Sequence, residues 1–366
     1  MEIKKVVLRQ IKLPLTSPFQ THQGTITDRS LIIVELEDHS GRRGYGEVTA
    51  FATPFYTYET TSTAWRVLID FLIPQIPFED LQHPGQLAES YKSIQGHPMA
   101  KAGLEGAMWD LYSKQQGESL SEVIGGTQKK VSAGAVLSLS ESLESDIKRL
   151  KETGYKRYKL KIKSGQEEGL IRAVKRVDPE LPIMIDANGM YSEEDIPHLL
   201  ELDRYGLMMI EQPFQAGDFY LHQNLQQQMK TPICLDESVM SYHDAMQAVE
   251  LSSCEIINVK ISRVGGLTEA LRIHDFCREK NIPVWCGGMV ESGVSKAHNL
   301  ALASLPNFSI PGDLSSSTRY FAKDIIKPGI EVENGEIEVP DQPGIGVEID
   351  YDYLSEVTLT TYQFNF

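Results

Sequence analysis

Hydrophobic and polar positions follow two different patterns along the chain. In the first third, segments 1–15, 30–38 and 41–51 carry apolar runs rich in Val and Ile, separated by polar turns. This pattern predicts three strands of an antiparallel meander. Segments 58–76 and 97–117 instead repeat apolar residues at helical spacing, and the second ends at a glycine, as helices often do. The first third is therefore predicted to be an α+β unit.

From about Val131 onward, short apolar strands alternate with helical segments. The predicted strands are 132–138, 157–163, 182–186, 207–211, 232–236, 254–260, 283–287 and 308–313. Such alternation predicts βαβ units and a parallel sheet, and eight strands favour a closed (β/α) barrel over an open sheet. No glycine-rich phosphate motif follows the first strand, which argues against dinucleotide binding.

The chain after Tyr320 returns to strands and turns. We therefore predict an α/β protein with a (β/α)7β-type TIM barrel and an α+β capping domain. The predicted boundaries are residues 1–126 for the cap, 127–320 for the barrel and 321–366 for a C-terminal segment that packs back on the cap.

Five ionisable residues stand at the ends of successive predicted strands. They are Lys163, Asp186, Glu211, Asp236 and Lys260, separated by 23, 25, 25 and 24 residues. This interval is about one βα unit, so each charged group should lie at the carboxyl end of its strand. In barrels, active sites lie at that end.

Side-chain alternation places Lys159, Lys161 and Lys163 on one face of their strand, and the apolar neighbours on the other. Three converging carboxylates repel one another, and a cation bound by oxygen ligands, Mg²⁺ (or Mn²⁺) rather than zinc, relieves that repulsion. Lys163 and Lys260 would face each other across the pocket. This arrangement suits proton abstraction next to a substrate carboxylate, with the metal and Lys161 lowering the pKa of Lys163.

Each of these residues has a simpler interpretation when taken alone. Asp186 and Asp236 could be N-caps of the helices that follow, and Glu211 could begin a helix. Lysines at strand ends are often merely solvated. The ordered set at nearly equal intervals favours a functional interpretation over these alternatives. A catalytically silent barrel would be expected to lack at least one of the five, and all five are present.

The pattern resembles the enolase superfamily, in its muconate-lactonizing-enzyme-like subgroup, over essentially the whole chain. The subgroup's Lys-x-Lys motif is matched to Lys161-Ile162-Lys163, with the second lysine as the base. The resemblance implies Asp186, Glu211 and Asp236 as metal ligands and Lys260 as the opposite lysine. Mandelate-racemase-like members would use a histidine from the later strands, where this chain has WCGGMVESG.

Within that subgroup, the sequence is similar to the branch of o-succinylbenzoate synthases and N-succinylamino acid racemases. The similarity rests on Pro54, Tyr56 and Glu59, which match a PxYxxE pattern, and on the long segment 287–321, followed by Asp324-Ile325. Dipeptide epimerases carry an Asp-x-Asp motif where this chain has Asp313-Leu314-Ser315, so that activity and cycloisomerisation rank lower.

The resemblance implies a hydro-lyase of menaquinone synthesis, which dehydrates 2-succinyl-6-hydroxy-2,4-cyclohexadiene-1-carboxylate to 2-succinylbenzoate. Lys163 would take the proton and return it to the departing hydroxyl, while Lys260 stays cationic. Racemisation of N-succinylamino acids is the alternative and needs the same residues. Arg263 resembles an arginine of racemase-capable members, although it could equally form only an ion pair.

Several further residues are weaker candidates. Lys161 would bind the substrate carboxylate or tune Lys163. Asn188 would lie beside the metal ligands or serve as a turn residue, and Glu237 would bond a lysine or simply start a helix. The remaining candidates lie in loops that could approach substrate: Gly287, Gly288, Phe19 and His22.

The amino-acid composition indicates which partners and which compartment to expect, but it does not indicate which reaction the protein catalyses. The 366 residues include 51 acidic and 35 basic ones, for a net charge of −16, which argues against a nucleic-acid partner. The start of the chain has no signal-like apolar run, and no stretch could span a membrane. The four cysteines form no CxxC pair and suggest buried free thiols. We expect a cytoplasmic protein that binds a small carboxylate substrate. The sequence leaves open whether the chain forms a homo-oligomer.

Overall fold

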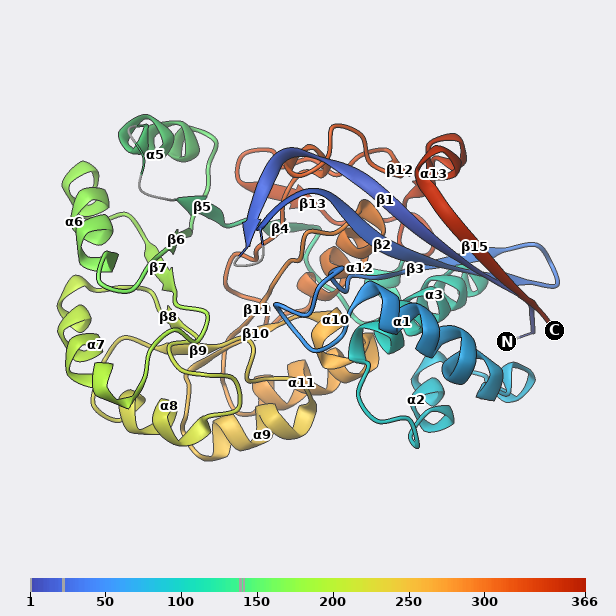
Figure 1. The fold of residues 1–366 in the computed structure, drawn as a ribbon, viewed down its shortest axis with the longest axis horizontal. Helices are drawn as coiled ribbons and strands as arrows, with labels where there is room; N and C mark the ends of the chain where they lie inside the picture. The colour runs from blue at the N-terminus through green and yellow to red at the C-terminus, as the bar shows by residue number, and fades with distance from the viewer. Residues whose placement is uncertain (1, 22–23, 138–139, 141) are drawn as a thin grey trace.

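The computed structural model describes residues 2–21, 24–137, 140 and 142–366, and for residues 19–21 and 24–25 only the backbone. Two layered parts lie side by side (Figure 1). A strand-rich cap is formed by both ends of the chain, and a parallel sheet surrounded by helices is formed by the middle. The α/β fold expected from the sequence, with a cap on a barrel-like sheet, is confirmed.

The cap is built on an antiparallel sheet in the order β15-β1-β2-β3. As predicted, β1 (Ile3–Thr21), β2 (Gly24–Asp38) and β3 (Arg43–Val48) form a meander. Residues 17–21 and 24–30, which we expected to lie in a loop with Phe19 and His22, instead continue β1 and β2 as paired antiparallel strands. Cross-strand hydrogen bonding evidently outweighs the polar composition there.

Helices cover one face of this sheet. The segment 58–76 forms α1 (Thr61–Val67), followed by a short π-helical and 3₁₀ extension, and α3 (Pro98–Gln116) is the long second helix. Gly117 ends α3 with φ +76°, as predicted. β3 touches α3 closely, since a Cβ on Gly46 would lie 1.9 Å from the Gly103 carbonyl oxygen. The shorter helices are α2 (Leu87–Ser90) and α4 (Leu120–Val123).

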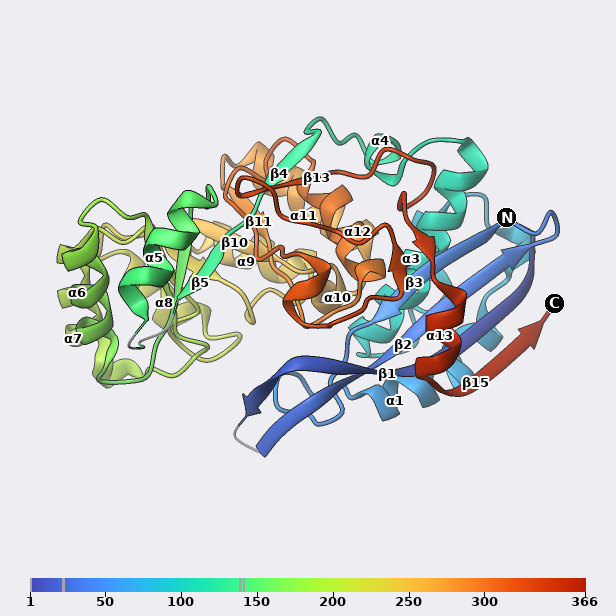
Figure 2. The same ribbon diagram turned by 90° about the horizontal axis from the view of Figure 1, so that it is seen from above.

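The middle of the chain forms a seven-stranded sheet in sequential order, parallel throughout. Its strands are β5 (Ala135–Leu137), β6 (Tyr158–Lys161), β7 (Ile183–Asp186), β8 (Ile210–Glu211), β9 (Ile233–Leu235), β10 (Ile256–Val259) and β11 (Val284–Cys286). Helices lie outside it (Figures 1 and 2). They are α5 (Leu143–Glu152), α6 (Glu167–Val177), α7 (Ile196–Leu202), α8 (Phe219–Gln226), α9 (Tyr242–Glu250), α10 (Ile261–Val264), α11 (Leu267–Glu279) and α12 (Gly293–Ala303).

The predicted eighth strand, 308–313, is not a strand. It connects the two edges of the sheet through single parallel bridges instead, between Val284 and Phe308 and between Ala133 and Gly312. A proline at position 311 cannot donate a ladder hydrogen bond, which is one reason a continuous strand does not form.

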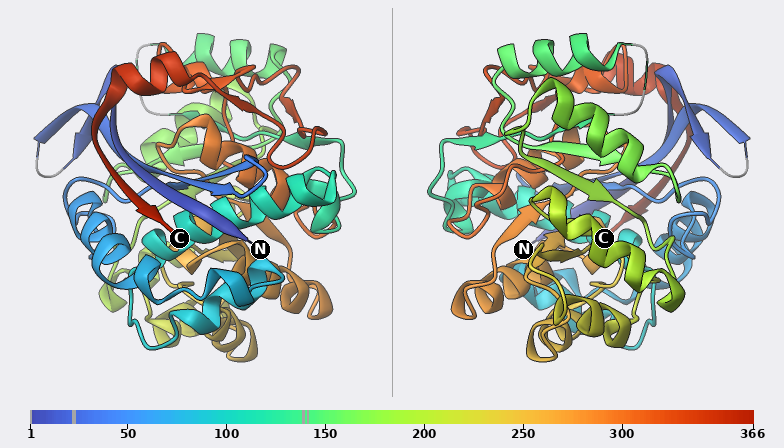
Figure 3. Two further views of the ribbon diagram at one scale, coloured as in Figure 1. Left: turned by 90° about the vertical axis from the view of Figure 1, so that its right-hand side faces the viewer. Right: turned by 90° about the vertical axis from the view of Figure 1, so that its left-hand side faces the viewer.

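The C-terminal tail contacts both parts. β13 (Glu336–Glu338) pairs with β4 (Lys130–Ser132), which leads into the parallel sheet, and β12 (Ile326–Lys327) pairs with β14 (Glu348–Ile349). After α13 (Tyr351–Val357), β15 (Thr358–Asn365) lies along β1, which brings the two ends of the chain together (Figure 3). β15 was not predicted from the sequence.

All four cysteines are buried free thiols, as expected. None of the helices in the described part of the chain is long and apolar enough to cross a membrane.

Candidate active site

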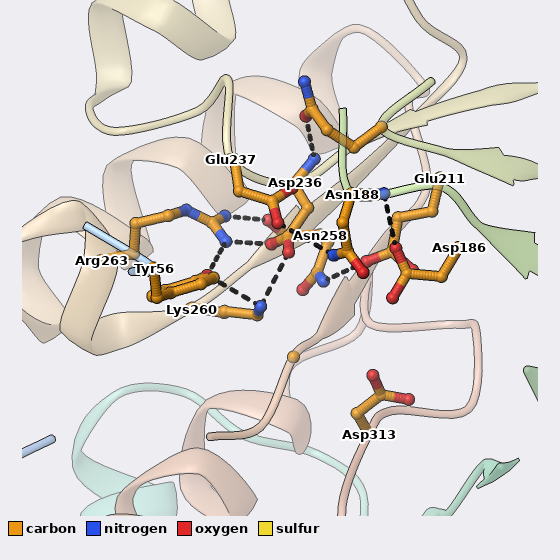
Figure 4. Close-up of polar contacts among 12 residues, drawn as sticks. Tyr56, Asp186, Asn188, Glu211, Asp236, Glu237, Asn258, Lys260, Arg263 and Asp313 are labelled. Atoms are coloured by element: carbon orange, nitrogen blue, oxygen red, sulfur yellow. Dashed lines mark hydrogen bonds and ion pairs between the residues drawn. The ribbon is translucent and has the colours of Figure 1, made fainter. Parts of the chain in front are cut away.

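Successive strands of the parallel sheet carry a row of ionisable side chains at their carboxyl ends. Lys161, Asp186 and Glu211 are register neighbours on β6, β7 and β8. Asp236 directly follows β9, and Lys260 directly follows β10. The three carboxylates therefore come from adjacent strands, with one lysine on each side of the row. Figure 4 shows Asp186, Glu211 and Asp236 on the same side of the sheet.

Lys159 lies among these carboxylates. Its Nζ is 3.0 Å from Asp186 Oδ2, 2.7 Å from Glu211 Oε2 and 2.9 Å from Asp313 Oδ2. Burial alone would raise the pKa of Asp186, but the charges of Lys159 and Lys161 outweigh burial and lower it to about 2. Burial similarly opposes the charged form of Lys159, yet the carboxylates raise its pKa well above the usual value. Asp186 and Lys159 are therefore held in their charged forms.

Glu211 is the least compensated member of the row. It is fully buried, and its Oε1 accepts a hydrogen bond from Asn258 Nδ2 at 3.0 Å. Its Oε2 lies close to the Lys159 ammonium without hydrogen-bond geometry, so this buried oxygen has no hydrogen-bond donor. Burial and then repulsion by Asp186 raise the pKa of Glu211 to about 8. Glu211 is therefore the member of the row whose charged form is least favoured.

At the other end of the row, Asp236 binds two basic groups. Its Oδ2 is 2.7 Å from Lys260 Nζ, and its Oδ1 pairs with the buried Arg263 guanidinium. Burial would raise the pKa of Asp236, but Arg263 and Lys260 lower it overall. Burial works against the charged form of Lys260, yet Asp236 raises the pKa of Lys260 above its usual value. The hydroxyl oxygen of Tyr56, from the cap, accepts a hydrogen bond from Lys260 Nζ at 3.0 Å (Figure 4).

The donor set fits a hard divalent cation. It offers only carboxylate oxygens from three adjacent strands, and one of these oxygens has no hydrogen bond. In the described part of the chain, no three Asp, Glu, His or Cys side chains are already arranged close enough to hold a metal ion. The Lys159 ammonium takes up the space between the carboxylates, so metal binding would require this side chain to move.

The structure corrects the position of the predicted base. β6 ends at Lys161, and Lys163 lies two residues beyond it, exposed and outside the cavity. Lys161 instead lines the cavity, pairs with Asp186 and lies 3.4 Å from Asn188 Oδ1. The role assigned to Lys163 is therefore wrong in position. The sequence contained the signal, since Lys161 is 25 residues before Asp186, which repeats the two 25-residue intervals that follow.

These groups open into a cavity of about 1150 Å³ between the parallel sheet and the cap. The cap supplies three aromatic side chains, Phe51, Phe55 and Tyr56. The floor carries charged groups: Lys159, Lys161, Asp186, Asp236, Lys260 and Asp313. Arg149, which pairs with Asp146 at 3.0 Å, and Arg319 also line the cavity. An anionic substrate with an apolar portion would suit these surroundings.

The secondary candidates lie near the row, with different partners than expected. Asn188 has φ +44°, as a turn residue can, and its side chain donates to Glu237 Oε1 at 3.0 Å. Glu237 makes this bond to Asn188 rather than to a lysine as predicted. Burial and then repulsion by Asp236 raise the pKa of Glu237. Arg263 is fully buried and pairs with Asp236, so the ion pair that the sequence allowed is present, although not at the surface.

Gly287 and Gly288, which follow β11, have no room for a side chain because neighbouring atoms lie too close to them. A Cβ on Gly287 would lie 2.3 Å from Asn258 Oδ1 and 2.6 Å from Lys260 Cε, and one on Gly288 would lie 2.2 Å from the Asp313 carbonyl oxygen. For Phe19 the structure describes only the backbone, in β1, and His22 lies outside the described residues.

Several residues of the site were not predicted from the sequence. Lys159 was placed on the inward face but given no role. Asp313, which also pairs with Arg157 at 2.6 Å, comes from the segment that closes the sheet, and Tyr56 comes from the cap. No spacing rule connects these distant segments with the strand ends. Burial raises the pKa of Asp313, but Lys159 and Arg157 outweigh it and lower the value.

A capping domain placed over a parallel (β/α) sheet, with lysines flanking a carboxylate row, is the arrangement that the sequence resemblance predicted. Residues 3–125 match the family model "Mandelate racemase / muconate lactonizing enzyme, N-terminal domain", and residues 142–353 match "Enolase C-terminal domain-like". The chain therefore belongs to the mandelate racemase/muconate lactonizing enzyme family of the enolase superfamily.

Named relatives are similar to this chain over nearly its whole length. The chain is 49% identical to an o-succinylbenzoate synthase of Bacillus subtilis, covering 97% of this chain and 96% of that protein. It is 40% identical to an N-succinylamino acid racemase of Thermus thermophilus, covering 98% of each. A solved structure of an enolase-superfamily member from Listeria innocua superposes with a TM-score of 0.96 at 41% identity, covering 100% of this chain and 99% of that one.

Proposed function

We propose that this chain catalyses the reaction of an o-succinylbenzoate synthase, the dehydration of 2-succinyl-6-hydroxy-2,4-cyclohexadiene-1-carboxylate to 2-succinylbenzoate in menaquinone synthesis. The observation that carries the proposal is the presence of Lys161 and Lys260 in one cavity, on either side of three carboxylates from adjacent strands. Relatives with 42–49% identity over nearly the whole chain bear this name, which supports the choice of substrate.

Lys161 is the residue that moves the proton. As a free amine, its Nζ takes the proton from the ring carbon that bears the substrate carboxylate. The resulting ammonium returns this proton to the ring hydroxyl on the same face. The carbon–oxygen bond breaks, water leaves, and the electrons of the former carbon–hydrogen bond complete the aromatic ring.

Lys260 acts as a fixed cation. Its contact with Asp236 and the hydroxyl of Tyr56 hold the ammonium at the other side of the cavity. Because its pKa lies above the usual value, this group stays protonated and stabilises the negative charge that develops on the substrate carboxylate. It thereby lowers the barrier to removal of the ring proton.

Asp186, Glu211 and Asp236 would hold the metal, which we propose to be Mg²⁺ because all three offer hard oxygen donors. When bound, the cation supplies Lewis-acid stabilisation of charge on the substrate carboxylate. Lys159, released from this space, would remain nearby as a further positive group. Arg149 and Arg319 in the cavity lining provide positive charge for the second carboxylate of the substrate.

Racemisation of N-succinylamino acids is the second candidate. It requires two lysines on opposite sides of the substrate α-carbon, and the cavity provides Lys161 and Lys260 in that relation. The named relative from Thermus thermophilus also supports it. The same site would then exchange the α-proton instead of expelling a hydroxyl.

A side-by-side assay of the wild-type chain with Mg²⁺ separates these activities. Formation of 2-succinylbenzoate from the dehydration substrate is the expected result. Incorporation of deuterium from D₂O at the α-carbon of N-succinylphenylalanine would add racemisation. Absence of 2-succinylbenzoate with a folded, Mg²⁺-loaded chain would contradict the proposed function.

A further inference from the structure

Arg29, in β2 of the cap, is buried with only 2% of its surface exposed, although no acidic side chain in the described part of the chain lies within ion-pair distance. Its guanidinium donates to backbone carbonyls instead: Nε to Val290 at 2.7 Å, Nη1 to Ala50 at 2.8 Å and to Ser30 at 2.9 Å, and Nη2 to Thr49. Burial lowers the pKa of Arg29 to about 10, so the group is still charged at neutral pH.

These carbonyls belong to both parts of the molecule. Thr49 and Ala50 begin the cap segment of residues 49–59, which we call the aromatic loop. Val290 lies in the connection that follows β11 and lines the cavity together with Gly288. A single planar guanidinium therefore fixes the aromatic loop against a wall of the active-site cavity.

The contact continues from Arg29 to the catalytic lysine. The guanidinium lies over the Phe51 ring, 4.0 Å from its centroid, and Phe51 contacts the ring of Tyr56 edge-on at 6.3 Å. The Tyr56 hydroxyl is in turn 3.0 Å from Lys260 Nζ. At the far end of the loop, Glu59 accepts from the backbone amides of Met99 and Ala100, so the aromatic loop is anchored at both ends.

We propose that Arg29 is a positioning residue, which sets the aromatic loop at the height where Tyr56 meets Lys260 and the aromatic side chains close over substrate. The kinetic part of this inference rests on the proposed dehydration. Arg29 itself does not line the cavity and touches no reacting group.

Arg29→Lys tests the proposal, because lysine keeps the charge but cannot span the carbonyls of Val290 and Thr49 or cover the Phe51 ring. We expect KM for the dehydration substrate to rise about tenfold while kcat falls less than about threefold, since substrate placement changes more than the reacting groups do. Backbone amides of residues 51–61 and 288–291 should exchange hydrogen about tenfold faster.

Glu105→Ala is the matched control. Glu105 also joins cap to barrel, accepting from the Thr268 amide at 3.1 Å, but it does not touch the aromatic loop. It should lower Tm comparably and leave KM within about twofold of wild type. If Arg29→Lys merely lowered Tm, with KM and loop exchange equal to those of Glu105→Ala, the positioning role would be refuted.

Two further readouts keep the test decisive. If the wild-type chain lacks dehydration activity, the exchange measurement still judges the loop anchoring, while the proposed function fails separately. If Arg29→Lys does not fold, Phe51→Leu removes the ring beneath the guanidinium and keeps the four hydrogen bonds. Faster exchange of residues 51–61, by about threefold, supports the proposal, and unchanged exchange overturns it.

Discussion

Two sets of carboxylates, one in the cap and one in the barrel, are compensated in different ways. In the cap, Glu47, Glu59 and Glu105 bind backbone amides at the beginnings of α12, α3 and α11. No Lys or Arg of the described residues forms an ion pair with them. Burial raises the pKa of each to about 7. In the barrel, Asp186, Asp236 and Asp313 pair with basic side chains, and their pKa values are lowered.

The difference between these two sets distinguishes acids that stabilise the fold from acids that could take part in chemistry. Amides at a helix beginning satisfy the hydrogen bonds of a carboxylate but offset only part of its charge. Ammonium and guanidinium groups offset the charge itself, which keeps the carboxylate ionised and ready to exchange its partner for a metal. Glu211, which shares the Lys159 ammonium with two other carboxylates, has a raised pKa and an oxygen without a hydrogen bond.

The largest expected effect follows from removing the proposed metal ion. Chelation with EDTA should lower the dehydration rate by on the order of 10³-fold, since Lewis-acid stabilisation contributes several kcal/mol. Adding Mg²⁺ should restore the rate. Activity that persists after exhaustive chelation would show that the barrel carboxylates serve only to neutralise lysines. The barrel carboxylates would then have a structural role, like Glu47, Glu59 and Glu105 of the cap.

The next largest effect concerns stability. Lys159→Met should lower the free energy of unfolding by about 3–5 kcal/mol in the absence of metal, because the buried Asp186 and Glu211 and the half-buried Asp313 lose a shared partner. Mg²⁺ should recover part of this loss, which a thermal melt with and without the metal would reveal. An equal loss with and without Mg²⁺ would argue that no cation can replace the ammonium.

Much of the fold followed from the sequence, because hydrophobic period and turns determine which segments become strands and helices. The predicted meander, the parallel strands and the strand ends bearing Asp186, Glu211 and Asp236 rest on that local signal. The side-chain alternation of 157–163 did not show where β6 stops, so Lys163 was placed in the site instead of Lys161. The 25-residue interval between Lys161 and Asp186, which equals the two intervals that follow, would have indicated Lys161 instead.

Contacts between distant segments could not be predicted in the same way. Asp313 reaches Lys159 from the segment that closes the sheet, and Tyr56 reaches Lys260 from the cap. Both depend on how the two parts pack. The eighth strand was predicted from an apolar run whose proline interrupts regular pairing, and β15 pairs with β1 from the opposite end of the chain.

The smallest expected effect is the pH dependence of the unfolding free energy that arises from the cap carboxylates Glu47, Glu59 and Glu105. A carboxyl group whose pKa is raised in the folded state binds protons more readily there than when unfolded, so it stabilises the fold most below its ordinary pKa. That contribution is lost as pH rises from about 4.5 through about 7. Glu105→Gln removes one such group. Relative to wild type, the variant should gain about 1–3 kcal/mol of unfolding free energy between pH 5 and pH 8.

Urea unfolding at several pH values measures this gain. Glu144→Gln, at an exposed position of α5, serves as the control and should show no comparable gain. If Glu105→Gln behaved like this surface variant, the cap carboxylates would be as well compensated as those of the barrel.

The central claim is that Lys161, at the end of β6, is the residue that moves the proton. It is tested most directly by comparing Lys161→Ala with Lys163→Ala in the dehydration assay with saturating Mg²⁺. The two lysines share a strand end and differ in whether they line the cavity. We predict that Lys161→Ala lowers kcat by about 10²–10⁴-fold and that Lys163→Ala stays within about threefold of wild type. Loss of turnover in Lys163→Ala, with Lys161→Ala active, would contradict the account.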